Sequence, residues 1–331
     1  MRHRPAGLVV LALLLVCAVI HPRPLCAEAR TARVGILSWR VGTSVEDTRR
    51  WYEPFTRSLA QGGWVEGKNL SVIYFFPTDF KASLLADMAE EMVQQKIDVI
   101  VADSAPSTQA AYRATRSIPI VALDFTNDPV AAGYAESYGR GGKNVTGVFL
   151  DAPEFAGKWF ELLTAVIPRL SRVAVLYDPA PGTAHLRAVE SVARARGIQL
   201  EVVEVHTPAD LERAFTSFQK RPQAVVVLPA PLTYTHAKRL GELSVKHRLP
   251  ATAMARRFAE YGGAMSYGPV LRAVYERCGE FVAKILNGSS PSELPIERPA
   301  KFELLVNLKT TERLGLKVPE AVMLRADELI R

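Results

Sequence analysis

The chain has 331 residues, of which 48% are hydrophobic and 23% are charged, a composition typical of a soluble folded protein and not of a disordered one. Its length exceeds that of one ordinary core and predicts two domains of roughly 150 residues each. The net charge of +7 is spread along the chain without a basic stripe that alternates with aromatic residues, so we expect no nucleic acid as a partner.

Residues 1–29 have the pattern of a secretory signal peptide. Arg2 and Arg4 form a basic start, Leu8–Ile20 is an apolar run, and Ala27–Ala29 offers a cleavage site between small residues. The apolar run is shorter than the roughly 20 residues that span a bilayer, which favours a cleaved leader over an anchor. We therefore expect an exported protein that is cleaved near Ala29 and resides in the periplasm.

The cysteines favour neither a lipid anchor nor a disulfide. A lipid-modified cysteine follows a small residue, but a valine precedes Cys17 and a leucine precedes Cys26. Cleavage after Ala29 removes both of these cysteines and leaves Cys278, which cannot form an intramolecular disulfide alone. We expect core burial to stabilise the mature chain.

The remaining sequence repeats one α/β pattern, because short β-branched runs alternate with longer amphipathic segments. Arg33–Leu37 resembles Arg172–Leu176, and a proline precedes the fourth predicted strand in both halves. The repeat predicts an α/β fold with two similar doubly wound, Rossmann-like domains. The predicted strands are Val34–Leu37, Leu70–Tyr74, Val99–Val101 and Ile120–Leu123 in the first half, and Val173–Leu176, Leu200–Val205, Ala224–Leu228 and Ala251–Met254 in the second.

Apolar residues at helical spacing predict the helices between these strands. The predicted helices are Val45–Gly62, Phe80–Gln95, 154–166, 183–196, 208–219 and Val270–Leu286. We expect a further strand at Phe302–Asn307, followed by short helices to the end of the chain. The pattern alone leaves open which domain each of these last elements joins.

The residues just past each strand are the candidates for a binding site, because ligands bind at the carboxyl ends of the strands in doubly wound sheets. These segments combine short polar groups, helix caps and aromatic side chains, a mixture that suits a small polar ligand. The candidates are Ser38, Trp39, Asp103, Ser104, Asp124, Phe125, Thr126, Asn127, Asp128, Asp178, Pro229 and Phe258.

Several candidates also have a plain structural explanation. Ser104 could only cap a helix, Asp178 with Pro179 could form an ordinary turn, and Trp39 could be buried core. Asp124–Asp128 is the least ordinary segment, since it places three acids or amides just past a buried strand. A ligand or hinge role is favoured there.

No catalytic set is visible in the sequence. Cys278 lies on the apolar face of a predicted helix, and the six histidines have no metal-binding spacing. Gly62–Asn69 nearly matches a phosphate-binding loop, but it ends in Asn and precedes a strand instead of following one. We therefore expect no catalytic residues, no metal and no cofactor.

Six segments taken in order form a recognisable set: Trp64–Leu70, Asp128–Gly133, Gly141–Gly147, Leu170–Leu176, Ala264–Gly268 and Lys301–Lys309. They resemble the ABC-transporter substrate-binding family, which includes binders of tryptophan and other aromatic amino acids. The similarity runs from about Arg33 to Arg331. Two loops depart from the family pattern, Asp103–Pro106 and Leu123–Asn127, and both belong to the expected pocket.

The resemblance implies a type I periplasmic binding fold in which hinge strands join the two domains. The crossings are expected near Val148–Ala152, Ser266–Val270 and Ile296–Phe302. We accordingly expect an N-terminal lobe of residues 30–149 plus about 270–298, and a C-terminal lobe of residues 150–269 plus about 299–331.

These observations predict a monomer that captures a small molecule, such as an amino acid or a similar polar or aromatic solute, and delivers it to an ABC permease. One alternative is a periplasmic sensor whose closed form binds a receptor kinase. An exported enzyme on the same scaffold would need acid, base or nucleophile groups that converge in the cleft. A transcription regulator would need a helix-turn-helix in front of the repeat, where this chain has the predicted leader.

Overall fold

The computed structural model describes residues 31–39, 45–78, 82–150 and 152–331. The predicted signal peptide, its cleavage site and the two cysteines within it lie outside these residues. Phe80, at the expected start of a helix, and Asp151, within the first expected crossing, also lie outside them.

The first sheet has six parallel strands in the order β11-β5-β4-β3-β1-β2. Every residue of β3, β4 and β5 is buried, as expected for parallel strands that are covered on both faces. The strands are β1 (Ala32–Leu37), β2 (Leu70–Phe75), β3 (Val99–Ala102), β4 (Ile120–Asp124), β5 (Val145–Phe149) and β11 (Ile296–Glu297).

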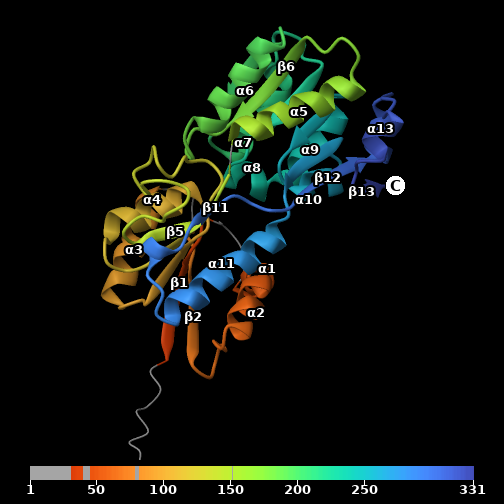
Figure 1. The fold of residues 1–331 in the computed structure, drawn as a ribbon. Helices are drawn as coiled ribbons and strands as arrows, with labels where there is room; N and C mark the ends of the chain where they lie inside the picture. The colour runs from red at the N-terminus through yellow and green to blue at the C-terminus, as the bar shows by residue number, and fades with distance from the viewer. Residues whose placement is uncertain (1–30, 40–44, 79–81, 151) are drawn as a thin grey trace, which may run out of the picture. The chain divides into compact units, whose positions relative to one another are not determined.

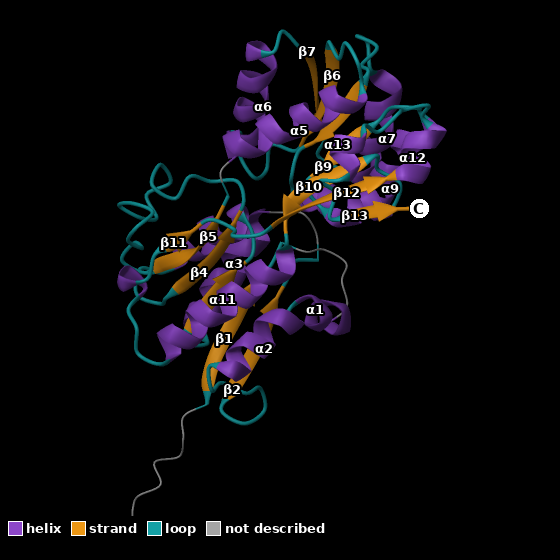
Figure 2. Cartoon of the chain, turned by 45° about the vertical axis from the view of Figure 1, so that its right-hand side comes forward, coloured by secondary structure: helices purple, strands orange, loops and turns teal. Residues whose placement is uncertain are grey.

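Helices cover both faces of this sheet (Figure 2). One face packs against α2 (Glu53–Gln61) and α11 (Leu271–Leu286), with Phe55 and Phe281 fully buried between helices and strands. The other face packs against α3 (Ala82–Gln94) and α4 (Ala105–Ala114). The short helix α1 (Val45–Trp51) precedes α2 directly.

The second sheet has seven strands in the order β13-β12-β10-β9-β8-β6-β7, and all its pairs are parallel except β10 with β12. Its strands are β6 (Arg172–Tyr177), β7 (Gln199–Glu204), β8 (Ala224–Val227), β9 (Ala251–Ala253), β10 (Met265–Pro269), β12 (Phe302–Asn307) and β13 (Glu328–Ile330). The helices of this half are α5 (Ala152–Val166), α6 (Ala184–Ala195), α7 (Pro208–Ser217), α8 (Pro231–Thr235), α9 (Ala237–Lys246), α10 (Arg256–Glu260), α12 (Leu308–Arg313) and α13 (Glu320–Met323).

The two sheets repeat one topology. The order β2-β1-β3-β4-β5 in the first sheet corresponds to β7-β6-β8-β9-β10 in the second, and the strands of each run are parallel to their neighbours. The predicted α/β fold with two similar doubly wound domains is therefore confirmed.

The described chain passes between the two sheets at three places. It leaves β5 for α5, which packs on α6 and β10 of the second sheet, and it leaves β10 for α11, which packs on α2, β4 and β5 of the first. Figure 1 shows α11, in blue, beside the red and orange elements of the first half. The chain then leaves β11 for β12. Each half thus contains a helix that follows the last parallel strand of the other.

Two expectations about elements were wrong. The single helix expected at Val45–Gly62 is divided into α1 and α2 at Tyr52, because Pro54 in the first turn of α2 has no N–H to continue the helix. The tail does not consist of short helices alone, since β13 pairs in parallel with β12. Three residues are too few for a strand to be recognised by periodicity.

Candidate functional site

A cavity of about 120 Å³ lies at the carboxyl ends of strands from both sheets. Its walls come from the loops after β1, β3 and β4 of the first sheet, and from the loops after β6, β8 and β9 of the second. Leu271 and Tyr275 of α11 complete the walls. By the same measure a water molecule needs about 10–15 Å³, so the cavity has room for roughly ten waters or for one solute of amino-acid size.

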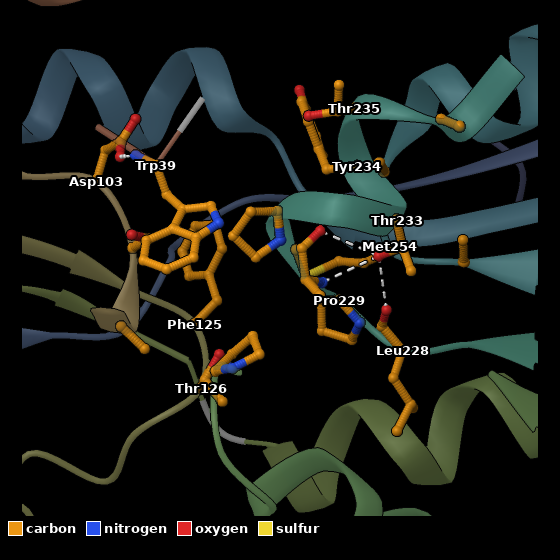
Figure 3. Close-up of a pocket in the computed structure, with 18 of the residues that line it drawn as sticks. Trp39, Asp103, Phe125, Thr126, Leu228, Pro229, Thr233, Tyr234, Thr235 and Met254 are labelled. Atoms are coloured by element: carbon orange, nitrogen blue, oxygen red, sulfur yellow. Dashed lines mark hydrogen bonds between the residues drawn. The ribbon is translucent and has the colours of Figure 1, made fainter. Parts of the chain in front are cut away.

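The cavity walls are mostly apolar, as is usual for small-molecule sites. Figure 3 shows Trp39 and Phe125 extending from one side toward Pro229 and Met254 on the other. The polar side chains on the described walls are few, which limits the number of directed contacts that a solute can make. They are Asp103, Ser104, Thr126, Thr233, Thr235 and the hydroxyls of Tyr234 and Tyr275.

The structure brings seven of the twelve sequence candidates together on the walls of this cavity. They are Trp39, Asp103, Ser104, Phe125, Thr126, Pro229 and Phe258. Ser38, Asp124, Asn127, Asp128 and Asp178 are described but do not line the cavity. Each of these five holds a neighbouring segment in place instead.

Asp103 is fixed by donors from three residues of the first half. The Ser38 hydroxyl donates to Oδ2 at 2.8 Å, the Tyr52 hydroxyl donates to the same oxygen, and the Trp39 backbone N–H lies 3.3 Å from Oδ1. The break between α1 and α2 places Tyr52 in this position, where its ring is fully buried and packs against Tyr74 and Tyr275 at centroid distances of 5.8 and 5.1 Å. The network holds one carboxylate at the cavity wall.

Ser104 and Trp39 combine the plain structural role with a place on the wall. Ser104 is the N-cap of α4, and its hydroxyl accepts a hydrogen bond from the Ser107 N–H at 3.2 Å. Trp39 is only 4% exposed and belongs to the core between the first sheet and α3. Both residues therefore stabilise the fold and also line the cavity.

Asp124 and Asp128 shape the loop that carries Phe125 and Thr126. Oδ1 of Asp124 accepts from the N–H groups of Thr126 and Asn127 at 2.9 and 3.0 Å, and Oδ2 accepts from the Asn127 side-chain amide at 2.7 Å. Complete burial raises the pKa of Asp124 to about 6 despite these donors. Oδ1 of Asp128 accepts from the N–H groups of residues 130 and 131 at 2.8 and 2.9 Å.

Asp178 forms the turn that follows β6. Its Oδ1 accepts a hydrogen bond from the Ala180 N–H at 2.9 Å, and burial raises the pKa of its carboxyl. The turn brings Pro181 to the cavity wall in place of Asp178 itself.

Several lining residues could not be identified from the sequence. Tyr234 and Thr235 lie on α8, which has five residues and no readable period, and Met254 directly follows β9. Leu271 and Tyr275 lie on a helix that packs on the opposite half of the molecule from the strand before it. The sequence pattern does not show that this helix packs on the other half of the molecule.

The loop after β4 also contacts the second half. Nε2 of His185 on α6 donates to the Phe125 backbone carbonyl, which fixes the ring proton on that nitrogen. His185 is 3% exposed, and burial lowers its pKa to about 4. The Phe125 side chain packs against hydrophobic clusters of both sheets, so the loop joins the two halves beside the cavity.

Cys278 of α11 is fully buried in the described fold. Burial raises the pKa of the Cys278 thiol to about 12, which disfavours the thiolate. The described residues include no group of three or more His, Cys, Asp or Glu side chains that could hold a metal ion. No helix in the described ranges has both the length and the apolar character needed to cross a membrane.

Comparison with known proteins agrees with this geometry. The sequence model of a family described as ABC transporter substrate binding protein matches residues 45–330. A tyrosine-binding protein of Clostridioides difficile is 25% identical over 267 residues, which cover 80% of this chain and 76% of that protein.

Two solved structures have closely similar folds. A conserved domain protein from Vibrio cholerae has a TM-score of 0.82 at 25% identity, and the match covers 91% of this chain and all of that one. A domain from Streptococcus pneumonia in complex with L-Trp has a TM-score of 0.81 at 21% identity, with the same coverage.

Proposed function

The chain belongs to the ABC transporter substrate-binding protein family, and we propose that it captures a small solute in the cavity and passes it to the permease of an ABC transporter. The two sheets form a type I periplasmic binding fold. The observation that carries the proposal is the cavity itself, whose walls are supplied by both sheets at the carboxyl ends of their strands.

Capture proceeds by closure of two lobes. Contacts from both lobes exist together only in the closed state, so a solute that makes them shifts the population toward that state. The lobes comprise residues 30–149 plus about 270–298, and 150–269 plus about 299–331. The three passages between the sheets act as the hinge. The packing of α11 on the first sheet and of α5 on the second supports this division.

The solute is an amino acid or a similar small molecule with an apolar or aromatic part. The aromatic walls suit that part, and the Asp103 carboxylate suits a protonated amine. The tyrosine-binding relative and the structure that holds L-Trp support this range of solutes. All four residues of Asp103–Pro106 line the cavity, as do Leu123, Phe125 and Thr126 of the loop Leu123–Asn127, so these two loops set the selectivity of this chain.

The working protein is an exported monomer that is cleaved near Ala29 and acts in the periplasm. It binds its solute without converting it. The permease recognises the closed form, in which both lobes present their outer faces in one fixed arrangement.

Thermal melting of residues 30–331 against amino acids, small organic acids, purines and sugars tests the proposal. A solute at 100 times its dissociation constant stabilises the protein by about 2.7 kcal/mol, which corresponds to roughly 5–10 °C. Asp103→Asn should reduce the shift, whereas Asp178→Asn, which changes an acid past a strand but off the cavity wall, should leave it. A panel in which no compound shifts the wild-type midpoint would contradict the proposal.

A further inference from the structure

Trp51 lies between two side chains from the other half of the molecule. It ends α1 and packs against the core of the first sheet. Tyr234 of α8 meets its ring edge-on at a centroid distance of 5.9 Å and an angle of 63°. The Arg257 guanidinium of α10 lies 5.2 Å from the centroid of the same ring. Both distances lie within the ranges of favourable aromatic and cation–π contacts.

The Arg257 guanidinium contacts the aromatic side chains of Trp51 and Tyr261. It donates to the Tyr261 hydroxyl at 3.2 Å and lies 5.4 Å from the centroid of that ring. Among the carboxylates whose side chains are described, none lies within ion-pair distance of Arg257. The adjacent Arg256, by contrast, is bonded to Glu260, Glu303 and Glu328. The attraction of Arg257 for the Trp51 face is therefore not offset by a competing described acid.

Trp51 and Arg257 do not line the solute cavity. Both line a neighbouring cavity of about 600 Å³, which shares five residues with the solute cavity: Tyr234, Met254, Ala255, Leu271 and Tyr275. Tyr234 thus faces the solute site and also contacts Trp51. A change at Trp51 or Arg257 leaves the described cavity wall chemically intact.

We infer that Trp51, Tyr234 and Arg257 form a clasp that holds the two halves together once the solute is bound, with Trp51 and Arg257 as positioning residues. The inference rests on the proposed function, since the clasp acts on lobes that open and close. Opening separates Trp51 from Tyr234 and Arg257, so this contact stabilises only the closed state. The clasp slows solute release and leaves the encounter with the open form unchanged.

The test compares Trp51→Ala, Arg257→Gln and the double variant in residues 30–331. Arg272→Gln is the matched control, because Arg272 lines the same neighbouring cavity but bonds to Glu276 of its own helix. The probes are L-tyrosine and L-tryptophan, together with the panel compound that raises the wild-type melting temperature most. Stopped-flow kinetics gives the association and dissociation rates, and melting without solute reports on the fold.

Each single variant should raise the dissociation rate about tenfold, with the association rate close to that of the Arg272→Gln control. Arg257→Gln should also keep the solute-free melting temperature of that control, whereas Trp51→Ala should lower it, because the Trp51 ring packs on the core of the first sheet as well. The double variant should release solute no faster than Trp51→Ala alone, because one contact is removed in both. A dissociation rate within twofold of wild type in both single variants would overturn the clasp and leave the proposed function standing. A wild-type chain that binds none of the probes or panel compounds would overturn both.

Discussion

At the scale of single residues, His185 is a neutral imidazole at a point where the two halves of the molecule meet. Its N–H donates to the Phe125 carbonyl, and the Trp159 ring lies 6.3 Å away between centroids. Its other ring nitrogen, Nδ1, is buried and has no hydrogen-bond partner among the described residues, so a second ring proton would find no acceptor in this part of the chain. Burial therefore holds the pKa of His185 near 4, below its ordinary value of about 6.5.

This burial predicts that acid weakens solute binding. Opening returns His185 to water and its pKa to about 6.5, so the open form binds more protons than the closed form between about pH 4 and 6.5. Closure is fully favoured above that range and becomes less favourable as the pH falls through it. With these two pKa values we expect affinity to drop about thirtyfold between pH 7.5 and pH 5. Titration calorimetry should show this loss of affinity in the wild type and a smaller change of affinity with pH in His185→Gln. Equal pH dependence of the dissociation constant in the two proteins would contradict the prediction.

Tyr52 acts on the site through Asp103. Tyr52→Phe removes the hydroxyl that donates to Asp103 Oδ2 and keeps the buried ring. A lost hydrogen bond to a charged group predicts an affinity up to about tenfold lower and also a lower melting temperature without solute, because the Asp103 oxygen loses a buried donor in the fold itself. Tyr112→Phe is the control, because its hydroxyl bonds to the Gly133 carbonyl away from the cavity wall. Identical dissociation constants for the two variants would exclude this role.

At the scale of elements, the exchange of helices holds each half together. Gly279 lies where α11 crosses α2, and a Cβ at this position would approach the Phe55 carbonyl oxygen to 2.6 Å and the Ser58 Cβ to 2.8 Å. Glycine thus permits the close packing of a helix that comes from the second half of the chain. The packing of α11 on α2 and on the first sheet depends on this glycine.

Gly279→Ala should therefore destabilise the protein by about 2 kcal/mol, because the backbone of α2 must move. Gly157→Ala on α5 is the matched control, since its Cβ would have no heavy atom within 4 Å. That variant should be stabilised by roughly 0.5–1 kcal/mol through helix propensity alone. Urea unfolding monitored by circular dichroism measures both. Equal effects of the two substitutions would contradict the close contact between α11 and α2.

The sequence predicts elements well where the pattern is local. Strands with continuous β-branched runs, such as Val99–Val101 and Ala224–Leu228, lie within one residue of their observed ends. Pro54 ends the predicted helix at Tyr52, but the contact of the Tyr52 hydroxyl with Asp103, which lies 51 residues further along the chain, leaves no local pattern in the sequence. The strand β13 escapes prediction because its partner, β12, stabilises it.

The sequence likewise predicts only some of the residues of the candidate site. Residues that follow a strand directly, such as Trp39 and Phe125, are found by the rule that ligands bind at the carboxyl ends of strands. The same rule also selects Asp124 and Asp178, whose carboxylates turn inward to bind backbone N–H groups. Tyr275 is missed because it reaches the cavity only through the packing of α11 on the first sheet.

At the scale of the whole molecule, the two halves are joined by three chain passages and by side-chain contacts around one cavity. His185 with Phe125, and Trp51 with Tyr234 and Arg257, link elements of both sheets beside the lining residues. None of these contacts crosses a shared sheet, so they can break without disrupting either core. This arrangement fits a protein that opens and closes as two rigid bodies.

Small-angle X-ray scattering of residues 30–331, with and without the compound that raises the melting temperature most, tests this account most directly. We predict a smaller radius of gyration with the compound, because solute contacts from both halves hold the closed form. Asp103→Asn should need a higher concentration of the compound for the same compaction. A compound that raises the melting temperature and leaves the radius of gyration unchanged would contradict capture by closure.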